Sequence, residues 1–511
     1  MVFMAGRRDR PETITKCLDD VLSAEPGRLA VLGPSGALSY GQLDAEADAA
    51  AEALAQLGVG RGDRVAACLP NDLDMVVAFH GAMRLGAVWV GVNRNLAPAE
   101  QGGLLDAATP AAFLAPPAVA ETHAGRHRSV AVEPGGEWAD ALAACRGAGR
   151  RDAPDPGLPA GIAFTSGTTG EPKGIVHSQH NLLLPAAALA EARGYDETLR
   201  KGDCLPLTVL NLQVLTTLLT SRAGGVCLLT DRRDARGVAE WIGRDGVTVW
   251  NGVPAIFYDL VRDESIDPSL LAPLREAWTG GAPCPEDLFH AVRERFGVTL
   301  HQTYGLTEAP TVATIEPLGG PHVPGGAGTP LPHLEVVIRD EGGQAAAAGE
   351  IGEIVVRARS DGPWAGRWRP MVGLWQDNRL RPYDGDELAT GDLGTLDADG
   401  NLSVRDRKKL LIVRGGANVY PAEVERVIEQ LPTVKASAVI GLPDDRLGQR
   451  VVAVVEAAPG ATVEPDAVVG HCAALLARYK VPEQVVVVDV LPRNAMGKVS
   501  RPPLGALFAG A

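Results

Sequence analysis

The residues with the clearest chemical potential lie between Thr165 and Lys173. The stretch Thr165-Ser166-Gly167-Thr168-Thr169-Gly170 places four hydroxyl groups and two glycines in six residues, and Lys173 follows. Glycine lets the backbone adopt positive φ and approach a ligand closely. Backbone N–H groups and hydroxyls can then surround phosphate oxygens, and a lysine adds positive charge. The stretch therefore predicts a phosphate-binding loop, although it does not match the common nucleotide-binding motif GxxxxGK[ST]. Its composition alone fits a solvated turn equally well.

The segment TSGTTGEPKG at 165–174 resembles the phosphate-loop signature of the adenylate-forming superfamily, which contains acyl- and aryl-CoA synthetases, peptide-synthetase adenylation domains and luciferases. Further motifs of the superfamily follow in the expected order, from LSYGQL at 38–43 to GKVSR at 497–501, so the resemblance spans nearly the whole chain. It is closest to the AMP-forming acyl-CoA synthetases. The resemblance implies ATP, Mg²⁺ and coenzyme A as cofactors and a small-molecule carboxylic acid as substrate.

The resemblance gives three more segments a nucleotide-binding role. GGAP at 280–283 is similar to the adenine-side loop, and TGDLGTLDADGNLSVRDRKK at 390–409 to the ribose-binding segment. HQTYGLTE at 301–308 is similar to the motif whose aromatic residue faces adenine and whose glutamate, here Glu308, holds Mg²⁺. The positions implied in these segments are Gly281, Ala282, Pro283, Thr303, Tyr304, Gly305, Thr307, Asp392 and Arg407. Without the resemblance, GGAP is a turn and Glu308 an exposed residue that caps a helix.

Three positions near the C-terminus also match the superfamily. Lys409 stands where the C-terminal domain hinges, although Leu410 replaces the aspartate that often follows. Gly415-Gly416 is similar to the glycine loop that enters the active site for thioester formation. Lys498, in LPRNAMGKVSR at 491–501, matches the lysine that bridges the carboxylate and the α-phosphate. Its charge would stabilise the transition state electrostatically, whereas by itself a lysine after a glycine is an ordinary surface residue.

The reaction that the resemblance implies has two steps. A carboxylate attacks the α-phosphate of ATP to give acyl-AMP and pyrophosphate, and coenzyme A then displaces AMP. The implied catalytic residues are Thr165, Lys173, Glu308 and Lys498. Two other readings stay open: an acyl-AMP ligase that loads a separate carrier protein, and a non-catalytic nucleotide-binding member of the family.

The predicted substrate-binding positions are Val209, Gly280 and Gly305, and Val209 and Gly305 bear on the kind of acid. Many relatives carry a histidine where Val209 stands, and no acidic residue that could pair with an amino group occurs between Leu205 and Leu219. A buried ammonium would therefore be left unpaired, which argues against amino-acid substrates. Gly305 replaces the tryptophan that closes the pocket in acetyl-CoA synthetases. We therefore predict a medium-sized or bulky apolar acid.

The elements that position these residues alternate between strand and helix patterns. GDRVAACLP at 62–70 and VTVWNGV at 247–253 are typical of buried strands, and MVVAFHGAMRLGA at 75–87 predicts a helix that ends at glycine. This alternation predicts an α/β multidomain protein with βα-layered sheets. LEVVIRD at 334–340 and NLSVRDR at 401–407 predict an additional β-rich subdomain.

The expected domains are an N-terminal adenylation domain over 1–406 and a small, mobile α+β domain over 407–511, with the hinge near Lys409. VVAVVEA at 451–457 and QVVVVDV at 484–490 are clear strand patterns in the second domain.

Composition limits the class of protein. The chain has 511 residues, which predicts at least two domains. Its net charge of −15 argues against a nucleic-acid partner. Its apolar runs are shorter than the roughly 20 residues that span a bilayer, which predicts no membrane insertion. Seven scattered cysteines without metal-ligand spacing, and no visible signal peptide, predict a cytoplasmic protein. The family resemblance suggests a homodimer.

Overall fold

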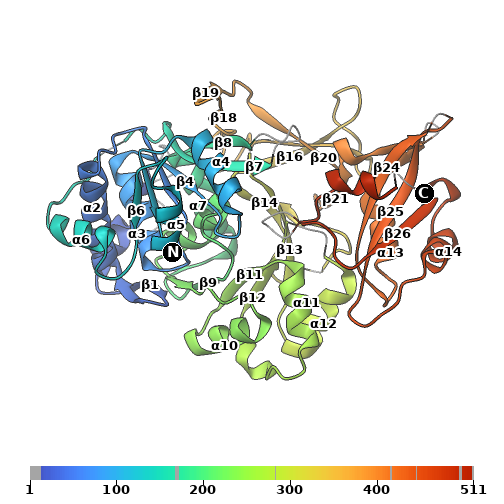
Figure 1. Cartoon of the computed structure of the whole chain (residues 1–511), viewed down its shortest axis with the longest axis horizontal. Coiled ribbons are helices and arrows are strands. Elements are labelled where there is room, and N and C mark those ends of the chain that lie inside the picture. The colour runs from blue at the N-terminus through green and yellow to red at the C-terminus, as the bar shows by residue number, and fades with distance from the viewer. Residues whose placement is uncertain are drawn as a thin grey trace. The chain divides into compact units, whose positions relative to one another are not determined.

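The computed structural model describes residues 13–152, 154–166, 172–281, 284–320, 322–414, 417–444, 446–493 and 498–508 (Figure 1). The chain divides into two compact units. We call them the N-terminal unit, Met1–Val336 with Val356–Leu388, and the C-terminal unit, Val337–Val355 with Ala389–Ala511. The predicted domain boundary after residue 406 and the hinge at Lys409 stay predictions.

One sheet of the N-terminal unit has nine strands in the order β15-β14-β13-β12-β11-β9-β10-β1-β2. The strands from β13 to β1 pair in parallel, and the edge strands β2, β14 and β15 are antiparallel. The strands are β1 (Leu29–Gly33), β2 (Gly36–Ser39), β9 (Arg200–Asp203), β10 (Val226–Leu229), β11 (Val249–Gly252), β12 (Glu276–Thr279), β13 (Leu300–Leu306), β14 (Thr311–Ile315) and β15 (Thr329–Pro330).

A second sheet has eight strands in the order β19-β18-β8-β7-β4-β3-β5-β6. Its strands from β7 to β6 are parallel, and β8, β18 and β19 extend it in antiparallel fashion. The strands are β3 (Arg64–Ala67), β4 (Val88–Gly91), β5 (Ala112–Ala115), β6 (Ser129–Ala131), β7 (Pro159–Ser166), β8 (Pro172–Ser178), β18 (Gly373–Gln376) and β19 (Arg379–Pro382).

Most helices of this unit lie between parallel strands in the sequence, as parallel pairing requires. The helices are η1 (Ile14–Lys16), α1 (Asp19–Ala24), α2 (Tyr40–Gln56), α3 (Leu73–Leu85), α4 (Pro98–Ala108), α5 (Pro117–His123), α6 (Glu137–Cys145), α7 (Gln179–Arg193), α8 (Leu210–Leu212), the π-helical η2 (Gln213–Leu218), α9 (Leu219–Ala223), α10 (Ala235–Asp245), α11 (Pro254–Arg262), η3 (Pro268–Leu271) and α12 (Glu286–Phe296). None of the described helices is long and apolar enough to cross a membrane.

Local sequence signals explain where the helices begin and end. Helix α2 starts with a capping box, in which the Ser39 hydroxyl accepts from the Gln42 N–H and the Gln42 side chain accepts from the Ser39 N–H. Helix α3 starts at the Asp72 cap and ends at Gly86, whose φ of 73° suits glycine.

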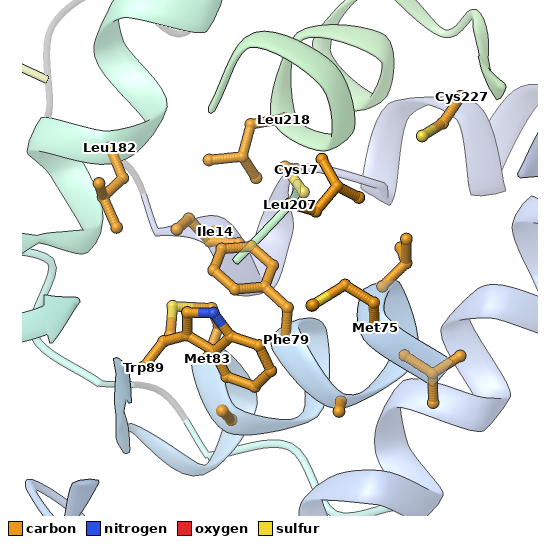
Figure 2. Close-up of a cluster of buried hydrophobic side chains, with 14 of the residues drawn as sticks. Ile14, Cys17, Met75, Phe79, Met83, Trp89, Leu182, Leu207, Leu218 and Cys227 are labelled. Atoms are coloured by element: carbon orange, nitrogen blue, oxygen red, sulfur yellow. The ribbon is translucent and has the colours of Figure 1, made fainter. Parts of the chain in front are cut away.

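The main core of the N-terminal unit surrounds helix α3. Figure 2 shows Phe79 of this helix between Met75, Met83 and Trp89, with side chains from η1 and from the segment around Leu207 above it. The rings of Phe79 and Trp89 meet edge to face with centroids 5.6 Å apart. The residues of α3 from Met75 to Leu85 are all buried.

A four-stranded sheet follows in the order β16-β17-β20-β21, formed by β16 (Leu334–Arg339), β17 (Gly352–Ala358), β20 (Glu387–Leu396) and β21 (Leu402–Arg407). The last sheet contains β22 (Ile412–Arg414), β23 (Ala417–Val419), β24 (Val434–Asp444), β25 (Gly448–Ala457) and β26 (Gln484–Val488). Its helices are η4 (Lys408–Leu410), α13 (Pro421–Ile428), α14 (Pro465–Leu475), η5 (Arg478–Lys480) and η6 (Pro502–Phe508). Strands β25 and β26 are parallel, and α14 lies between them in the sequence.

The predicted fold class is confirmed. The strand patterns at 62–70 and 247–253 contain β3 and β11, and the helix predicted at 75–87 corresponds to α3. In the C-terminal unit the patterns at 451–457 and 484–490 contain the end of β25 and all of β26.

Candidate active site

The predicted phosphate loop connects two antiparallel strands. Strand β7 pairs with β8 as far as Ser166 opposite Pro172, and Thr165 lies opposite Lys173. The register therefore places Lys173 at the end of the hairpin, beside the loop. Several of the predicted positions lie outside the described residues: Gly167, Thr168, Thr169 and Gly170, together with the side chains of Thr165 and Ser166.

A buried histidine ties this hairpin to the segment that carries Glu308. His177, in β8, is fully buried, and its Nε2 lies 2.7 Å from the carbonyl oxygen of Thr307. Because a carbonyl only accepts, Nε2–H donates, while Nδ1 is buried without a hydrogen-bond partner. Burial lowers the pKa of His177 to about 4, against the opposing effect of the Thr307 hydrogen bond, so the ring is neutral at pH 7. Sequence reasoning did not single out this residue.

The Tyr304–Gly305 step contains a β-bulge. Strand β13 pairs with β14, and the register shifts between Tyr304 and Gly305. Thr311, which pairs with Leu306 next to the bulge, has a φ of 75°, a strained conformation for a β-branched residue. Tyr304 is buried, and Glu308 lies half-buried on the turn after β13. Bulges and strained residues often mark functional sites, and neither is visible in the sequence.

Gly305 is required by packing. A Cβ at this position would lie 2.0 Å from the Thr311 carbonyl oxygen. Glycine is therefore needed here whatever the acid, and its presence alone says little about the size of an acyl pocket. At the neighbouring strand end, a Cβ on Gly280 would lie 2.2 Å from the Thr303 hydroxyl, which donates to the Thr279 carbonyl at 3.1 Å. Gly281 has a φ of 76°, and Ala282 and Pro283 lie outside the described residues.

The segment that carries Val209 is held by a buried asparagine. The Asn71 amide donates to the carbonyls of Leu205 at 2.8 Å and Thr230 at 3.2 Å, and its oxygen accepts from Leu207 N–H at 2.9 Å. Val209 itself is partly buried at the start of α8. Sequence analysis missed Asn71, since an Asn after a Pro is usually a turn residue.

In the C-terminal unit, Asp392 and Arg407 lie directly opposite each other on β20 and β21. Arg407 Nε is 3.3 Å from Asp392 Oδ1. The Asp392 side chain is mostly buried, while that of Arg407 is 55% exposed. The two residues predicted to hold one sugar are thus neighbours.

Lys498 belongs to the same group of charges. Desolvation and the positive charge of Arg407 lower the pKa of the Lys498 ammonium, whereas Asp392 opposes both effects. The residue as a whole is exposed. A cationic side chain near a carboxylate and a guanidinium is suited to hold an anionic group.

The predicted hinge region contains a second buried carboxylate. Asp406 accepts the N–H of Ala422 at 2.8 Å, in the first turn of α13, and burial raises the pKa of Asp406. Lys409 is exposed in η4, and its neighbour Lys408 pairs with Glu353 at 2.9 Å. Gly415 and Gly416 lie outside the described residues.

Comparison with known proteins assigns the chain to a family. Residues 18–361 match the model of the AMP-binding enzyme family, and residues 423–498 match that of the AMP-binding enzyme C-terminal domain. The chain belongs to the AMP-binding enzyme family.

Individual relatives align over almost the full length. The long-chain-fatty-acid–CoA ligase FadD13 of Mycobacterium tuberculosis is 34% identical over 90% of this chain and 91% of its own. The indoleacetate–CoA ligase of Aromatoleum aromaticum is 33% identical over 97% of this chain and 98% of its own. Among solved structures, ATP-bound MatB from Rhodopseudomonas palustris superposes with a TM-score of 0.87 at 28% identity, covering 97% of this chain and 99% of that one.

Proposed function

We propose that this chain is an ATP-dependent acyl-CoA ligase. The carboxylate oxygen of an acid attacks the α-phosphorus of ATP and pyrophosphate leaves. The thiol sulfur of coenzyme A then bonds to the acyl carbon, the thiol proton is lost and AMP leaves. The observation that carries the proposal is the nearly full-length match to CoA ligases, which extends over both family models.

The charged group of the C-terminal unit supports the first step. Asp392 is a mostly buried carboxylate that can accept hydrogen bonds from the ribose hydroxyls, and Arg407 lies beside it. We assign to Lys498 the stabilisation of negative charge as the carboxylate approaches the α-phosphate. Such an electrostatic contribution typically accounts for about 10²- to 10³-fold in rate.

The N-terminal unit would hold the phosphates and the metal. We assign phosphate binding to the loop that begins at Thr165 and to Lys173, which the hairpin register places at its end. The half-buried carboxylate of Glu308 is a hard oxygen donor of the kind that Mg²⁺ takes together with phosphate oxygens. Mg²⁺ held there would neutralise phosphate charge. His177 would fix the main chain next to Glu308.

We also propose that the acid is medium-sized or bulky and apolar. The aligned relatives named above are a long-chain-fatty-acid ligase and an indoleacetate ligase, whose acids are largely apolar. No acidic residue lies between Leu205 and Leu219 to receive an amino group. Maximal activity on acetate or on an amino acid would refute this part of the proposal.

The test is pyrophosphate release with ATP, Mg²⁺ and a panel of acids from acetate to fatty, alicyclic and aryl carboxylates, with and without coenzyme A. Release stimulated by one class of acid, together with an acyl-CoA product, is the expected result. If pyrophosphate is released without a thioester of coenzyme A, and a phosphopantetheinyl carrier protein is acylated, then the acceptor is the carrier protein and not coenzyme A. ATP binding without release on any acid would support a non-catalytic nucleotide-binding protein.

A further inference from the structure

Strand β25 carries a buried carboxylate in an otherwise apolar row. Side chains alternate along a strand, and Val451, Ala453 and Val455 pack with residues of α13 and α14 on one face of the sheet. Val452 and Val454 pack on the opposite face against Leu491, Leu504 and Phe508. Two residues further along, Glu456 continues this second row and is fully buried. The apolar pattern predicts a valine or leucine here, so the glutamate calls for an explanation.

The carboxylate of Glu456 joins two cations and one backbone N–H. Its Oε1 lies 2.6 Å from Lys435 Nζ, and its Oε2 lies 3.2 Å from Arg493 Nη2. The same Oε2 accepts the Leu491 N–H at 2.9 Å. Desolvation raises the pKa of Glu456, but the hydrogen bonds from Lys435, Leu491 and Arg493 outweigh it, and the pKa is lowered overall. The group is therefore a buried anion held by its partners.

Two of these partners begin the segment that leads to Lys498. Arg493 forms an antiparallel bridge with Val499, and the Ser500 N–H donates to the Pro492 carbonyl at 2.7 Å. These contacts bring the two ends of the segment together, and Lys498 directly precedes the bridge. After the bridge, Arg501 pairs with Glu425 at 2.6 Å. Glu456 thus fastens the entry of the segment to the sheet, and Glu425 fastens its exit.

We propose that Glu456 is a positioning residue for Lys498: by holding Leu491 and Arg493, it sets the place from which the lysine reaches the reacting phosphate. This inference rests on the proposed role of Lys498 in acid adenylation. A lysine on a loosened segment would spend less time in the productive position, and misplacement by about 1 Å can cost on the order of 10²-fold in rate.

Lys435 provides a matched control. It pairs with the same carboxylate as Arg493, but it lies in β24, outside the segment that carries Lys498. Its side chain is 48% exposed and that of Arg493 is 35% exposed, so the two cations have similar access to water. Removing Lys435 leaves one oxygen of the buried carboxylate without its cation and should lower stability. Leu491 and Arg493 still hold the other oxygen, so the lysine segment should stay in place.

The experiment compares wild type, Glu456→Gln, Arg493→Met, Lys435→Met and Lys498→Ala. The two half-reactions are measured separately: pyrophosphate release from ATP and acid, and thioester formation from preformed acyl-adenylate and coenzyme A. Unfolding temperatures are recorded for each protein. Glu456→Gln and Arg493→Met should slow adenylation by roughly 10- to 100-fold and leave thioester formation near wild type, and Lys435→Met should leave both half-reactions near wild type.

Equal slowing of both half-reactions by Glu456→Gln, or the same defect in Lys435→Met, would show that Glu456 only stabilises the sheet and would overturn the inference. If Glu456→Gln does not fold, Arg493→Met tests the same contact from the partly exposed side. If wild type is active, Lys498→Ala is inactive and the Glu456 and Arg493 variants are unaffected, the positioning role is refuted. The proposed function would still stand. A wild type without adenylation on any acid would instead refute the proposed function.

Discussion

In the N-terminal unit the candidate site residues are held by strand register and by neutral buried side chains, whereas in the C-terminal unit they are held by ion pairs around carboxylates. His177 and Asn71 fix main-chain carbonyls in the first unit without carrying charge. In the second unit, Asp392 pairs with Arg407 and Glu456 with Arg493. Neutral hydrogen bonds in a dry core define one geometry, while partly solvated ion pairs allow more movement.

This difference suits the proposed division of labour. The residues that bind phosphate must keep one arrangement throughout the reaction. A lysine that serves only the adenylation step must be able to leave the active site afterwards. The contrast leads to four predictions, given from the largest expected effect to the smallest.

Lys498→Ala should abolish most of the adenylation activity. Removing one charge that stabilises the transition state typically costs about 10²- to 10³-fold in kcat. Thioester formation from preformed acyl-adenylate should stay near wild type, because the lysine has no proposed role in that step. Pyrophosphate release and thioester formation, measured separately, check the prediction. A variant that loses both half-reactions equally would contradict the assignment of Lys498 to a single step.

Asp392→Asn should weaken ATP binding by roughly 10- to 100-fold, since hydrogen bonds to a charged group contribute about 1.5–3 kcal/mol. Calorimetric titration with ATP measures the change. Asp397→Asn is the matched control, because Asp397 accepts bonds from Asn401 within its own turn. If both substitutions weaken ATP binding alike, Asp392 does not contact the nucleotide.

His177→Ala should leave the part-buried Thr307 carbonyl without its donor, at a cost of about 1–3 kcal/mol in the free energy of unfolding. Because Glu308 follows Thr307, we also expect a higher KM for ATP and a greater Mg²⁺ requirement. His180→Ala is the control, since His180 bonds the Arg367 carbonyl at 2.9 Å outside the candidate site. An effect of His177→Ala on stability alone would remove His177 from the site.

Acid should destabilise the N-terminal unit more than the C-terminal unit. Burial lowers the pKa of His80 and His333 to about 3 and of His177 and His301 to about 4, from an ordinary value of 6.5. The unfolded chain therefore binds protons below pH 6.5 that the folded unit does not. The contribution of these histidines to the stability of the unit is fully present above pH 6.5 and is lost as the pH falls through their lowered pKa values.

The C-terminal unit has the opposite tendency. The lowered pKa of Glu456 is an exception. Burial raises the pKa of Asp406 and Glu425 above their ordinary values of 3.8 and 4.5, and that of Glu429 from 4.5 to about 7. Their contribution to stability is fully present below those values and is lost as the pH rises through the raised ones. At pH 5 the unfolding temperature of the N-terminal unit should therefore fall by a few degrees more than that of the C-terminal unit.

The two units can be followed independently. All 8 tryptophans of the chain lie in the N-terminal unit, so tryptophan fluorescence reports its unfolding. Hydrogen exchange of peptides from β24, β25 and α13 reports the C-terminal unit. Earlier loss of exchange protection in the C-terminal unit on acidification would contradict the predicted order.

Local sequence patterns were sufficient for much of this protein. The alternation of strand and helix patterns predicted the α/β sheets, because burial on one face imposes a period of about two or 3.6 residues on the chain itself. The glycine-rich, hydroxyl-rich stretch at 165–170 predicts a phosphate loop from the backbone freedom and donor groups of those residue types, and this stays a prediction. The order of the motifs led to the family that the comparisons show.

Only the tertiary structure decided which buried polar groups meet. His177 contacts Thr307 across 130 residues, and Glu456 contacts Arg493 across 37. Gly305 was interpreted from the sequence as room for an acid, whereas the structure explains it by the close approach of the Thr311 carbonyl. Such pairings depend on strand register and on which hydrogen-bond donor the fold brings within reach of a buried acceptor. Sequence periodicity encodes the face that a residue occupies, but not the partner that it finds there.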